Sequence, residues 1–312
     1  MEYREYDFII IGAGPAGLSA AQYASRAGLK VLVLDMSMPG GQVNQIFKIE
    51  NYPGVYPCVD GFTLSNTMKK QAVDFGAEFV QAVITGADKV DGNYVVKTSK
   101  VEYTSPVVLL ATGAKHSKIG VKGEKEFEGR GVSYCATCDG PFFRDKKILV
   151  VGGGDSACSE ACYLSTIADT VYMVHRRSQF RAQKAVADEV LKNPKIKVIF
   201  NASVTEIKGD VKVKAVELTD SVTQQKQDID VDAVFVCVGL QPQTPFFDAL
   251  RKDDKGYIIT NEDMETGIPG LYAAGDVRSK SFRQVVTAVS DGAIAANNAA
   301  AFVRKIRKED YR

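Results

Sequence analysis

The sequence contains no tryptophan and only two histidines among its 312 residues, and it carries almost no net charge. With so few histidines, any metal site would have to be built from thiolates. The 39 lysines and arginines are balanced by 38 aspartates and glutamates, so no overall field favours nucleic acid or an anionic membrane surface. The apolar runs, such as Phe8 to Ile11 and Ala233 to Val238, are far shorter than the roughly 18 residues that a membrane span needs. We therefore expect neither nucleic acid nor a membrane as a partner.

The N-terminal residues also lack the basic region, the long apolar stretch and the cleavage site of a secretory signal. Six cysteines in a chain without such a signal are typical of catalytic or metal-binding thiols in a reducing compartment. We therefore expect a cytoplasmic protein. A content of 45% hydrophobic and 25% charged residues is ordinary for a globular protein, and the length favours two domains.

The chain repeats one plan twice: a strand, a glycine-rich turn, a helix and a second strand, followed later by an apolar strand that runs into glycine. In the first copy these segments are residues 7–11, 12–17, a helix to about 28, 30–34 and 107–113; in the second they are 148–151, 152–157, a helix, 170–174 and 233–239. A third strand-to-glycine segment, LYAAGD at 271–276, precedes an alanine-rich helical pattern from about Gln284 to Lys305.

This last segment is too short to form a domain by itself, so we expect it to complete the first domain. The predicted fold is therefore α/β, with two Rossmann-like, three-layer ββα domains, the second inserted into the first. The predicted boundaries are residues 1–114 and 246–312 for the outer domain and 115–245 for the inserted one.

The first glycine-rich turn has the context of a dinucleotide-binding loop. Gly12, Gly14 and Gly17 follow a strand and open a helix, whose first turn suits Pro15. Such a turn lets a pyrophosphate approach the backbone at the positive end of the helix. Asp35, at the end of the next strand, would accept bonds from ribose hydroxyls and repel a 2′-phosphate. We expect FAD or an NAD-like ligand here; the alternative is a tight turn with no ligand.

The second turn is the related G-x-G-x-x-A variant. Gly152 and Gly154 stand at the glycine positions and Ala157 at the third, while Asp155 and Ser156 add polar groups near the expected phosphates. The position that holds an acid in the first copy is basic in this one.

Arg176 and Arg177 follow the second strand, and Arg181 comes one helical turn later. Guanidinium groups at this place can bind a 2′-phosphate bidentately, so we expect NADPH. The alternative is a solvated basic start of a helix.

Between the two loops, Cys135 and Cys138 form a C-x-x-C motif, which can cycle between dithiol and disulfide. Asp139 follows at once and could move a proton to or from a sulfur; alternatively, it serves as a turn or N-cap carboxylate.

The cysteine pair has a second interpretation. Together with Cys158 and Cys162 it gives C-x2-C-x19-C-x3-C, close to the spacing of a zinc ribbon. Both added cysteines fall in the helix that the second loop should start, so zinc and nucleotide would make competing demands. We interpret them, like Cys58 and Cys237, as small packing residues, and expect no metal.

The motifs occur in the order found in bacterial-type, low-molecular-weight thioredoxin reductases, and essentially the whole chain resembles that family. The motifs are GAGPAG (12–17), GGQ (40–42), ENYPG (50–54), ATGA (111–114), CATCDG (135–140), GGGDSA (152–157), HRR (175–177) and AAGDV (273–277). The chain departs from the family pattern at Lys122, where a proline is usual, and at Cys158 and Cys162.

The resemblance implies that FAD is lined by Asp35 and by Gly41, Gln42, Asn51, Thr112, Gly275, Asp276, Arg283, Gln284 and Val285. It also implies that Cys138 faces the flavin, that Cys135 attacks thioredoxin, and that the protein is a homodimer.

We therefore expect electrons to pass from NADPH to FAD, to the Cys135–Cys138 disulfide and on to oxidised thioredoxin. The cysteine pair and the NADPH loop share the inserted domain, so they must take turns at one flavin, most simply by domain rotation. The alternatives are an oxidase of small dithiols, a ferredoxin-fed reductase and a flavin-bound sensor without turnover. Arg176, Arg177 and Arg181 disfavour the dithiol oxidase and the ferredoxin-fed reductase, because neither enzyme needs them.

Overall fold

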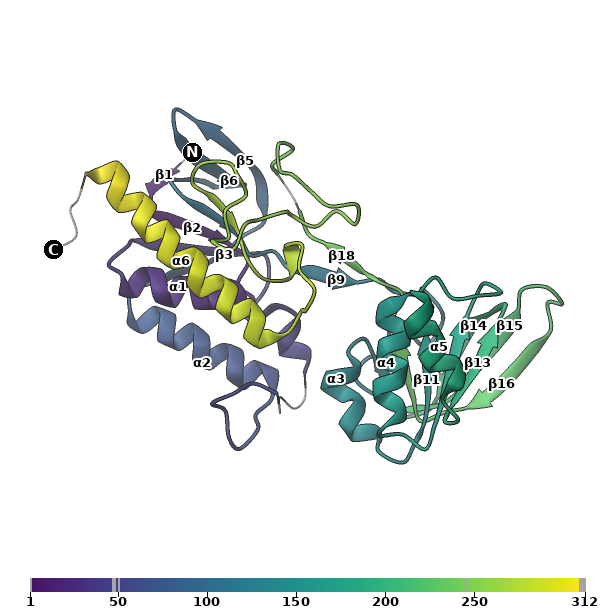
Figure 1. Cartoon of the computed structure of the whole chain (residues 1–312). Helices are drawn as coiled ribbons and strands as arrows, with labels where there is room; N and C mark the ends of the chain where they lie inside the picture. Colours follow the sequence, from purple (N-terminus) through teal and green to yellow (C-terminus); the bar gives the residue numbers. More distant parts are fainter. Residues whose placement is uncertain (1, 47–48, 50, 245, 309–312) are drawn as a thin grey trace. The chain divides into compact units, whose positions relative to one another are not determined.

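The computed structural model describes residues 2–46, 49, 51–244 and 246–308, and the chain divides into two compact units (Figure 1). Unit 1 comprises Met1–Lys115 and Gln241–Arg312, and unit 2 comprises His116–Leu240. Pro245, where we expected the inserted domain to end, lies outside the described residues. Strands β9 (Ala114–His116) and β18 (Leu240–Pro242), in which the chain leaves and re-enters unit 1, form a two-stranded sheet.

A five-stranded parallel sheet in the order β19-β8-β2-β3-β4 forms the centre of unit 1. Its strands are β2 (Phe8–Ile11), β3 (Val31–Asp35), β4 (Glu78–Gln81), β8 (Val108–Leu110) and β19 (Leu271–Ala273). All four residues of β2 are buried, because both faces of this strand are covered, and that burial explains its unbroken apolar sequence. Since β19 comes from the C-terminal stretch, the sheet is complete only after the chain has returned from unit 2.

Unit 1 has three layers. Helices α1 (Pro15–Arg26), α2 (Gly61–Asp74) and α6 (Val285–Arg307) lie side by side (Figure 1). Phe8 and Ile10 of β2 pack with the alanine-rich α1 and α6, whereas Ile9 and Ile11 point to the opposite face. That face packs on a four-stranded sheet in the order β1-β7-β6-β5, made of β1 (Glu2–Glu5), β5 (Ile84–Val90), β6 (Asn93–Thr98) and β7 (Val101–Ser105).

Unit 2 repeats this plan around a parallel sheet in the order β10-β17-β11-β12-β13. Its strands are β10 (Val132–Ser133), β11 (Lys147–Val151), β12 (Thr170–His175), β13 (Ile196–Phe200) and β17 (Ala233–Val236). Ile148 and Val150 face α4 (Asp155–Ser165) and α5 (Lys184–Lys192). Leu149 and Val151 face an antiparallel sheet of β14 (Ala202–Gly209), β15 (Val213–Asp220) and β16 (Lys226–Asp230).

The predicted α/β fold, with two Rossmann-like three-layer units and one inserted into the other, is confirmed. The remaining short elements are helix α3 (Ala136–Asp139) and the 3₁₀ helices η1 (Gly41–Gln45), η2 (Gly140–Phe143) and η3 (Gly275–Val277). The sequence placed Cys237 inside an apolar strand, but β17 ends at Val236, so this cysteine follows the strand. Among the described helices, none combines the length and the apolarity needed to cross a membrane.

Candidate functional site

The first glycine-rich turn lies between β2 and α1, and packing explains two of its three glycines. A Cβ on Gly17 would lie 1.9 Å from the carbonyl oxygen of Gly12. Gly12 itself has a φ of +105°, and its Cβ would come within 2.4 Å of the carbonyl oxygen of Ala111. Gly14, the N-cap of α1, is different, because a Cβ there would meet nothing within 4 Å. Gly14 therefore faces open space at the helix N-terminus, where a phosphate group fits.

Asp35 is fixed at the edge of this space. Its Oδ2 accepts a hydrogen bond of 2.7 Å from the backbone N–H of Ala13, and its Oδ1 accepts one of 2.7 Å from that of Ser37. The carboxylate is thus tied to the glycine turn at the end of β3, where the sequence predicted a partner for ribose hydroxyls.

The segment from the C-terminal stretch comes close to the same turn. A Cβ on Gly275 would lie 2.9 Å from the Cβ of Ala16, so η3 packs directly on the start of α1. Asp276 follows, and its Oδ1 is buried without a hydrogen-bond partner in the described part of the chain. Lys280 Nζ lies 3.5 Å from this oxygen. Burial raises the pKa of Asp276, and a ligand hydroxyl would supply the hydrogen bond that Oδ1 lacks.

A largely buried ion-pair network centred on Asp291 is connected to Asp276 through Lys280. Asp291 of α6 accepts hydrogen bonds from Gly275 N at 3.0 Å, from Arg278 Nη1 at 2.9 Å and from Lys280 Nζ at 3.1 Å. Its side chain is only 10% exposed. The sequence analysis did not identify Asp291, because its partners become visible only when α6 packs beside η3.

Other residues predicted to line FAD also lie in unit 1. Gly41 approaches the first turn, since its Cβ would be 3.5 Å from the Cα of Gly14. Asn51 Nδ2 donates to Gln284 Oε1 at 3.0 Å, and Gln284 caps α6 just before Val285.

Three further side chains of this set are tied to the backbone. Gln42 Nε2 donates to the carbonyl oxygen of Ala114, and Thr112 Oγ1 donates to that of Gln243. The guanidinium of Arg283 stacks 4.0 Å from the ring centroid of Tyr257 and donates to the carbonyl oxygen of Arg278 at 3.1 Å. Glu50, part of the ENYPG motif, lies outside the described residues.

The second glycine-rich turn, between β11 and α4, has the same steric pattern. A Cβ on Gly152 would lie 2.5 Å from the carbonyl oxygen of Cys237, whereas one on Gly154 would meet nothing within 4 Å. Asp155 Oδ1 accepts from Gln183 N at 2.7 Å, and Ser156 is exposed. This turn therefore also presents open space at a helix N-terminus.

The predicted arginines lie beside this second turn. The backbone N–H of Arg181 donates to the carbonyl oxygen of Gly153 at 2.7 Å. Burial and the positive charges of Arg181, Arg177 and Arg176 lower the pKa of His175, so all three guanidinium groups are near this imidazole. They are exposed, and within the described ranges none forms an ion pair. Three unpaired cations beside a helix N-terminus form a suitable site for an extra phosphate.

The cysteine pair is closed. Cys135 and Cys138 form a disulfide, with their Cα atoms 5.3 Å apart, at the start of α3. Asp139 ends this helix, and burial raises the pKa of its carboxyl group, while a hydrogen bond from Ser133 lowers it. A half-buried carboxyl group therefore directly follows Cys138, at the end of the short helix that starts at the disulfide. Ser133 was not identified from the sequence.

The other cysteines do not join this pair. Cys158 is buried in α4, and burial raises its pKa to about 11; burial also raises the pKa of Cys162 to about 11. Cys237 Sγ donates to Glu160 Oε2 at 2.7 Å, and burial raises its pKa further. Across the described residues, no group of three or more cysteine, histidine or acidic side chains is arranged to hold a metal ion.

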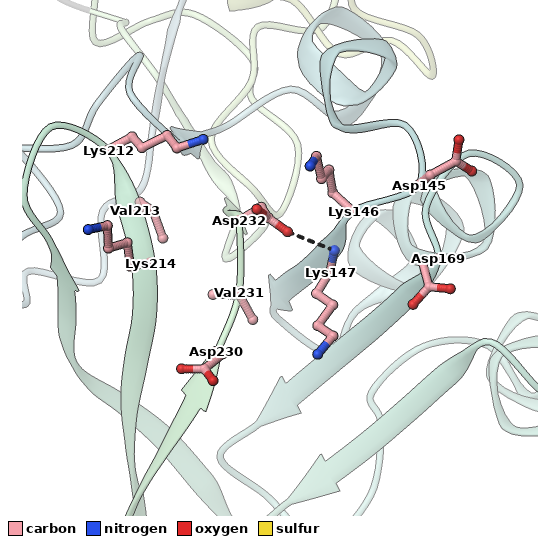
Figure 2. Close-up of a pocket in the computed structure, with 10 residues that line it drawn as sticks. All are labelled: Asp145, Lys146, Lys147, Asp169, Lys212, Val213, Lys214, Asp230, Val231 and Asp232. Carbon is pink, nitrogen blue, oxygen red and sulfur yellow. Dashed lines mark hydrogen bonds between the residues drawn. The ribbon is translucent and has the colours of Figure 1, made fainter.

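Unit 2 also contains a pocket of about 490 Å³, lined by four lysines, four aspartates and two valines (Figure 2). Lys147 begins β11, while Asp169 and Asp232 directly precede β12 and β17. The pocket thus lies at the amino ends of these strands, whereas the glycine turn leaves the carboxyl end of β11. Ligands of open α/β sheets bind at the carboxyl ends, and none of the predicted site residues lines this pocket.

Comparisons with known proteins agree with this arrangement. A family model described as pyridine nucleotide-disulphide oxidoreductase matches residues 6–292. A protein of Treponema pallidum (strain Nichols) named thioredoxin reductase is 50% identical over 299 residues, which cover 96% of this chain and 97% of that protein. The crystal structure of thioredoxin reductase from Streptococcus pyogenes MGAS5005 is 43% identical, covers 96% of this chain and 99% of its own, and has a TM-score of 0.91. The structure of Lactococcus lactis thioredoxin reductase in the FR conformation is also 43% identical with 96% and 99% coverage, but has a TM-score of 0.67.

Proposed function

We propose that this chain, which belongs to the pyridine nucleotide-disulphide oxidoreductase family, is a thioredoxin reductase that uses NADPH, FAD and the Cys135–Cys138 disulfide to reduce oxidised thioredoxin. The observation that carries the proposal is the disulfide followed directly by a half-buried carboxyl group, in a chain that also has two nucleotide-type glycine turns. A binding module without turnover would need neither the disulfide nor the acid.

FAD fits the first turn. Gly14 leaves room for the pyrophosphate at the start of α1, Asp35 is positioned for ribose hydroxyls, and Asp276 has a buried oxygen in need of a donor. Gly41, Thr112 and Gly275 also approach this turn. We assign the remaining residues of the predicted FAD set to the same cofactor because of the family resemblance.

NADPH fits the second turn. Gly154 leaves room for its pyrophosphate, and Arg176, Arg177 and Arg181 supply unpaired cations for a 2′-phosphate. Such cations are of no use to an enzyme that takes its electrons from a ferredoxin. Bound together, the two cofactors supply a two-electron relay in which a hydride becomes an electron pair for the disulfide.

The chain's own residues then handle sulfur and protons. Opening the disulfide gives two thiols, and we assign Cys138 to the flavin side and Cys135 to the attack on the disulfide of thioredoxin. Asp139 exchanges a proton with the sulfurs, because burial keeps its pKa raised. The pairing needs no metal.

The inserted unit carries both the cysteine pair and the NADPH turn, so we propose that it alternates between two orientations toward the flavin. Two solved relatives with equal identity to this chain differ in their TM-scores. They therefore differ from each other in three-dimensional arrangement, which supports alternation within the family.

We further propose that the protein is a cytoplasmic homodimer. Large apolar side chains remain exposed on the helical layer of unit 1, among them Tyr23 at 50%, Phe62 at 50% and Ile306 at 49%. Such residues are more common at interfaces than on free surfaces. Light scattering of the purified protein tests the dimer, and a mass of one chain at micromolar concentration would contradict it.

The Cys135→Ser variant tests the exchange role. With NADPH under anaerobic conditions its flavin absorbance should bleach as in the wild type, while reduction of thioredoxin is lost. Cys58→Ser is the matched control, because Cys58 is a free cysteine of unit 1, and it should keep full activity. Normal turnover of thioredoxin by Cys135→Ser would refute the proposed route.

A further inference from the structure

Ser133 lies in the core of unit 2, two residues before Cys135 of the redox disulfide. It is the last residue of β10 and is only 5% exposed. In the parallel pairing of β10 with β17, Ser133 lies opposite Phe235, whose side chain is fully buried. The serine therefore belongs to the central sheet of unit 2, and its position is set by the core.

Its hydroxyl group connects the side chain of Asp139 to the backbone of Cys135. Ser133 Oγ donates to Asp139 Oδ2 at 2.6 Å and accepts from the backbone N–H of Cys135 at 3.1 Å. The carbonyl oxygen of Cys135 is a longer second acceptor, at 3.4 Å. The hydroxyl has one hydrogen, an ionised carboxylate can only accept, and the Asp139 contact is the shorter one, so that hydrogen is directed to the carboxylate.

The second carboxylate oxygen of Asp139 is available to exchange a proton. Within the part of the chain that the structure describes, the other oxygen, Oδ1, makes no hydrogen bond. It is also not fully buried. Asp139 directly follows Cys138, and its backbone N–H donates to the carbonyl oxygen of Cys135 at 3.1 Å. One oxygen is thus anchored while the other remains accessible at the same turn as both sulfurs.

We propose that Ser133 is a positioning residue for proton transfer at the Cys135–Cys138 pair, holding one oxygen of Asp139 so that the other exchanges protons with the sulfurs. This proposal rests on the proposed function. Two electrons and two protons convert the disulfide into two thiols. In the transfer to thioredoxin, the Cys135 thiolate forms a mixed disulfide and releases one thioredoxin thiolate.

The second half of the exchange balances the first. The Cys138 thiolate then attacks Cys135, reforms the disulfide and releases the second thioredoxin thiolate, so thioredoxin leaves with two electrons and two protons. Asp139 takes the proton from the attacking thiol and gives it to a departing thiolate. Ser133 acts only through Asp139.

The hydrogen bond also sets the pH at which Asp139 works. Burial raises the pKa of Asp139, and the bond from Ser133 opposes this rise by stabilising the carboxylate. Helix α3 packs on η2, which has no titratable side chain, and on α4. The titratable side chains of α4 are Asp155, Cys158, Glu160, Cys162 and Tyr163, and none of them contributes to the shift.

Replacing Ser133 by alanine therefore has a defined direction. Without the donor, the carboxylate is less stable, the pKa of Asp139 rises further, and the ionised form appears only at higher pH. The low-pH limb of thioredoxin reduction should move to higher pH. At the acidic end of the profile, the rate should fall roughly threefold to tenfold.

The experiment measures the Asp139 carboxyl directly. The FAD-loaded, oxidised full-length protein, labelled with ¹³C at aspartate carboxyls, is titrated by NMR, and Asp139→Asn assigns the signal. Ser165→Ala is the matched control, because Ser165 lies in the same unit, is also 5% exposed and has a hydroxyl that makes hydrogen bonds. The Asp139 midpoint should move up in Ser133→Ala and stay in place in Ser165→Ala. An unmoved midpoint in Ser133→Ala, or equal shifts in both variants, would overturn the proposal.

A second arm tests whether Ser133 acts through Asp139. In an Asp139→Asn background, adding Ser133→Ala should change neither the rate nor its pH dependence. A further loss in the double variant would mean that Ser133 acts independently of Asp139 and would overturn the proposal. Because the NMR titration needs no turnover, it also separates this inference from the proposed function, which fails if the wild type does not reduce thioredoxin.

Discussion

Gly14→Ala offers the sharpest test of the first nucleotide turn. A Cβ at this position meets no atom of the chain within 4 Å, and the φ of −71° is accessible to alanine. We therefore expect the free energy of unfolding of the apoprotein to change by less than about 1 kcal/mol, since alanine lowers backbone entropy but is a poorer N-cap than glycine. The Gly14→Ala apoprotein should therefore fold as the wild type does.

Binding of FAD, in contrast, should be weakened in Gly14→Ala. The added methyl group would occupy the open space in which the pyrophosphate approaches the start of α1. Loss of one hydrogen bond to a charged group corresponds to about 1.5–3 kcal/mol, or roughly a 10- to 150-fold weaker dissociation constant. Flavin is removed from the protein and titrated back, and its fluorescence reports binding.

Gly86→Ala is the matched control, because Gly86 is in β5 of the same unit and its Cβ would make only an ordinary contact of 4.0 Å with Lys97. It adds the same methyl group away from the turn, so FAD affinity should match the wild type. If Gly14→Ala bound FAD as tightly as Gly86→Ala, the placement of the pyrophosphate beside Gly14 would be wrong.

Two further predictions concern charge. Replacing Arg176 and Arg177 by alanine should raise the KM for NADPH roughly 10- to 100-fold and leave the KM for NADH unchanged. The control Lys192→Ala, which removes an exposed charge of α5, should change neither KM. An unchanged ratio of the two KM values in the arginine variant would contradict the assignment of these arginines to the 2′-phosphate. Asp291→Asn should lower the free energy of unfolding in urea by about 3–5 kcal/mol, because it leaves the mostly buried Arg278 without a carboxylate and Lys280 with only Asp276. In the control Asp228→Asn, which breaks the exposed ion pair with Lys208, the free energy of unfolding should fall by less than about 1 kcal/mol. Equal losses of stability in the two variants would contradict this reasoning.

Much of the fold could be predicted because its central strands are buried on both faces. Residues 148–151 were predicted as a strand, and β11 spans Lys147–Val151; the helix expected from about Gln284 is α6, Val285–Arg307. Such strands show as unbroken apolar runs bordered by glycine. The strands of the second sheet in each unit could not be located, since sequences such as that of β16, KQDID, lack this signal.

The candidate site could be predicted where chemistry depends on local spacing. The two glycine turns and the C-x-x-C motif are patterns of a few neighbouring residues. In contrast, Asp291, which accepts a hydrogen bond from η3, lies 15 residues after Asp276 in another helix. Cys237 and Glu160, which form a hydrogen bond, are 77 positions apart. These contacts depend on how the layers pack, and a single sequence without its fold contains no signal for them.

The central claim is that electrons from NADPH reach one particular disulfide. One equivalent of NADPH is added anaerobically to the FAD-loaded protein, in which Cys135 and Cys138 are joined, and free thiols are then alkylated and located by mass spectrometry. We expect new adducts on these two cysteines, and none when NADPH is omitted. Reduced flavin with both cysteines still unmodified would contradict the account.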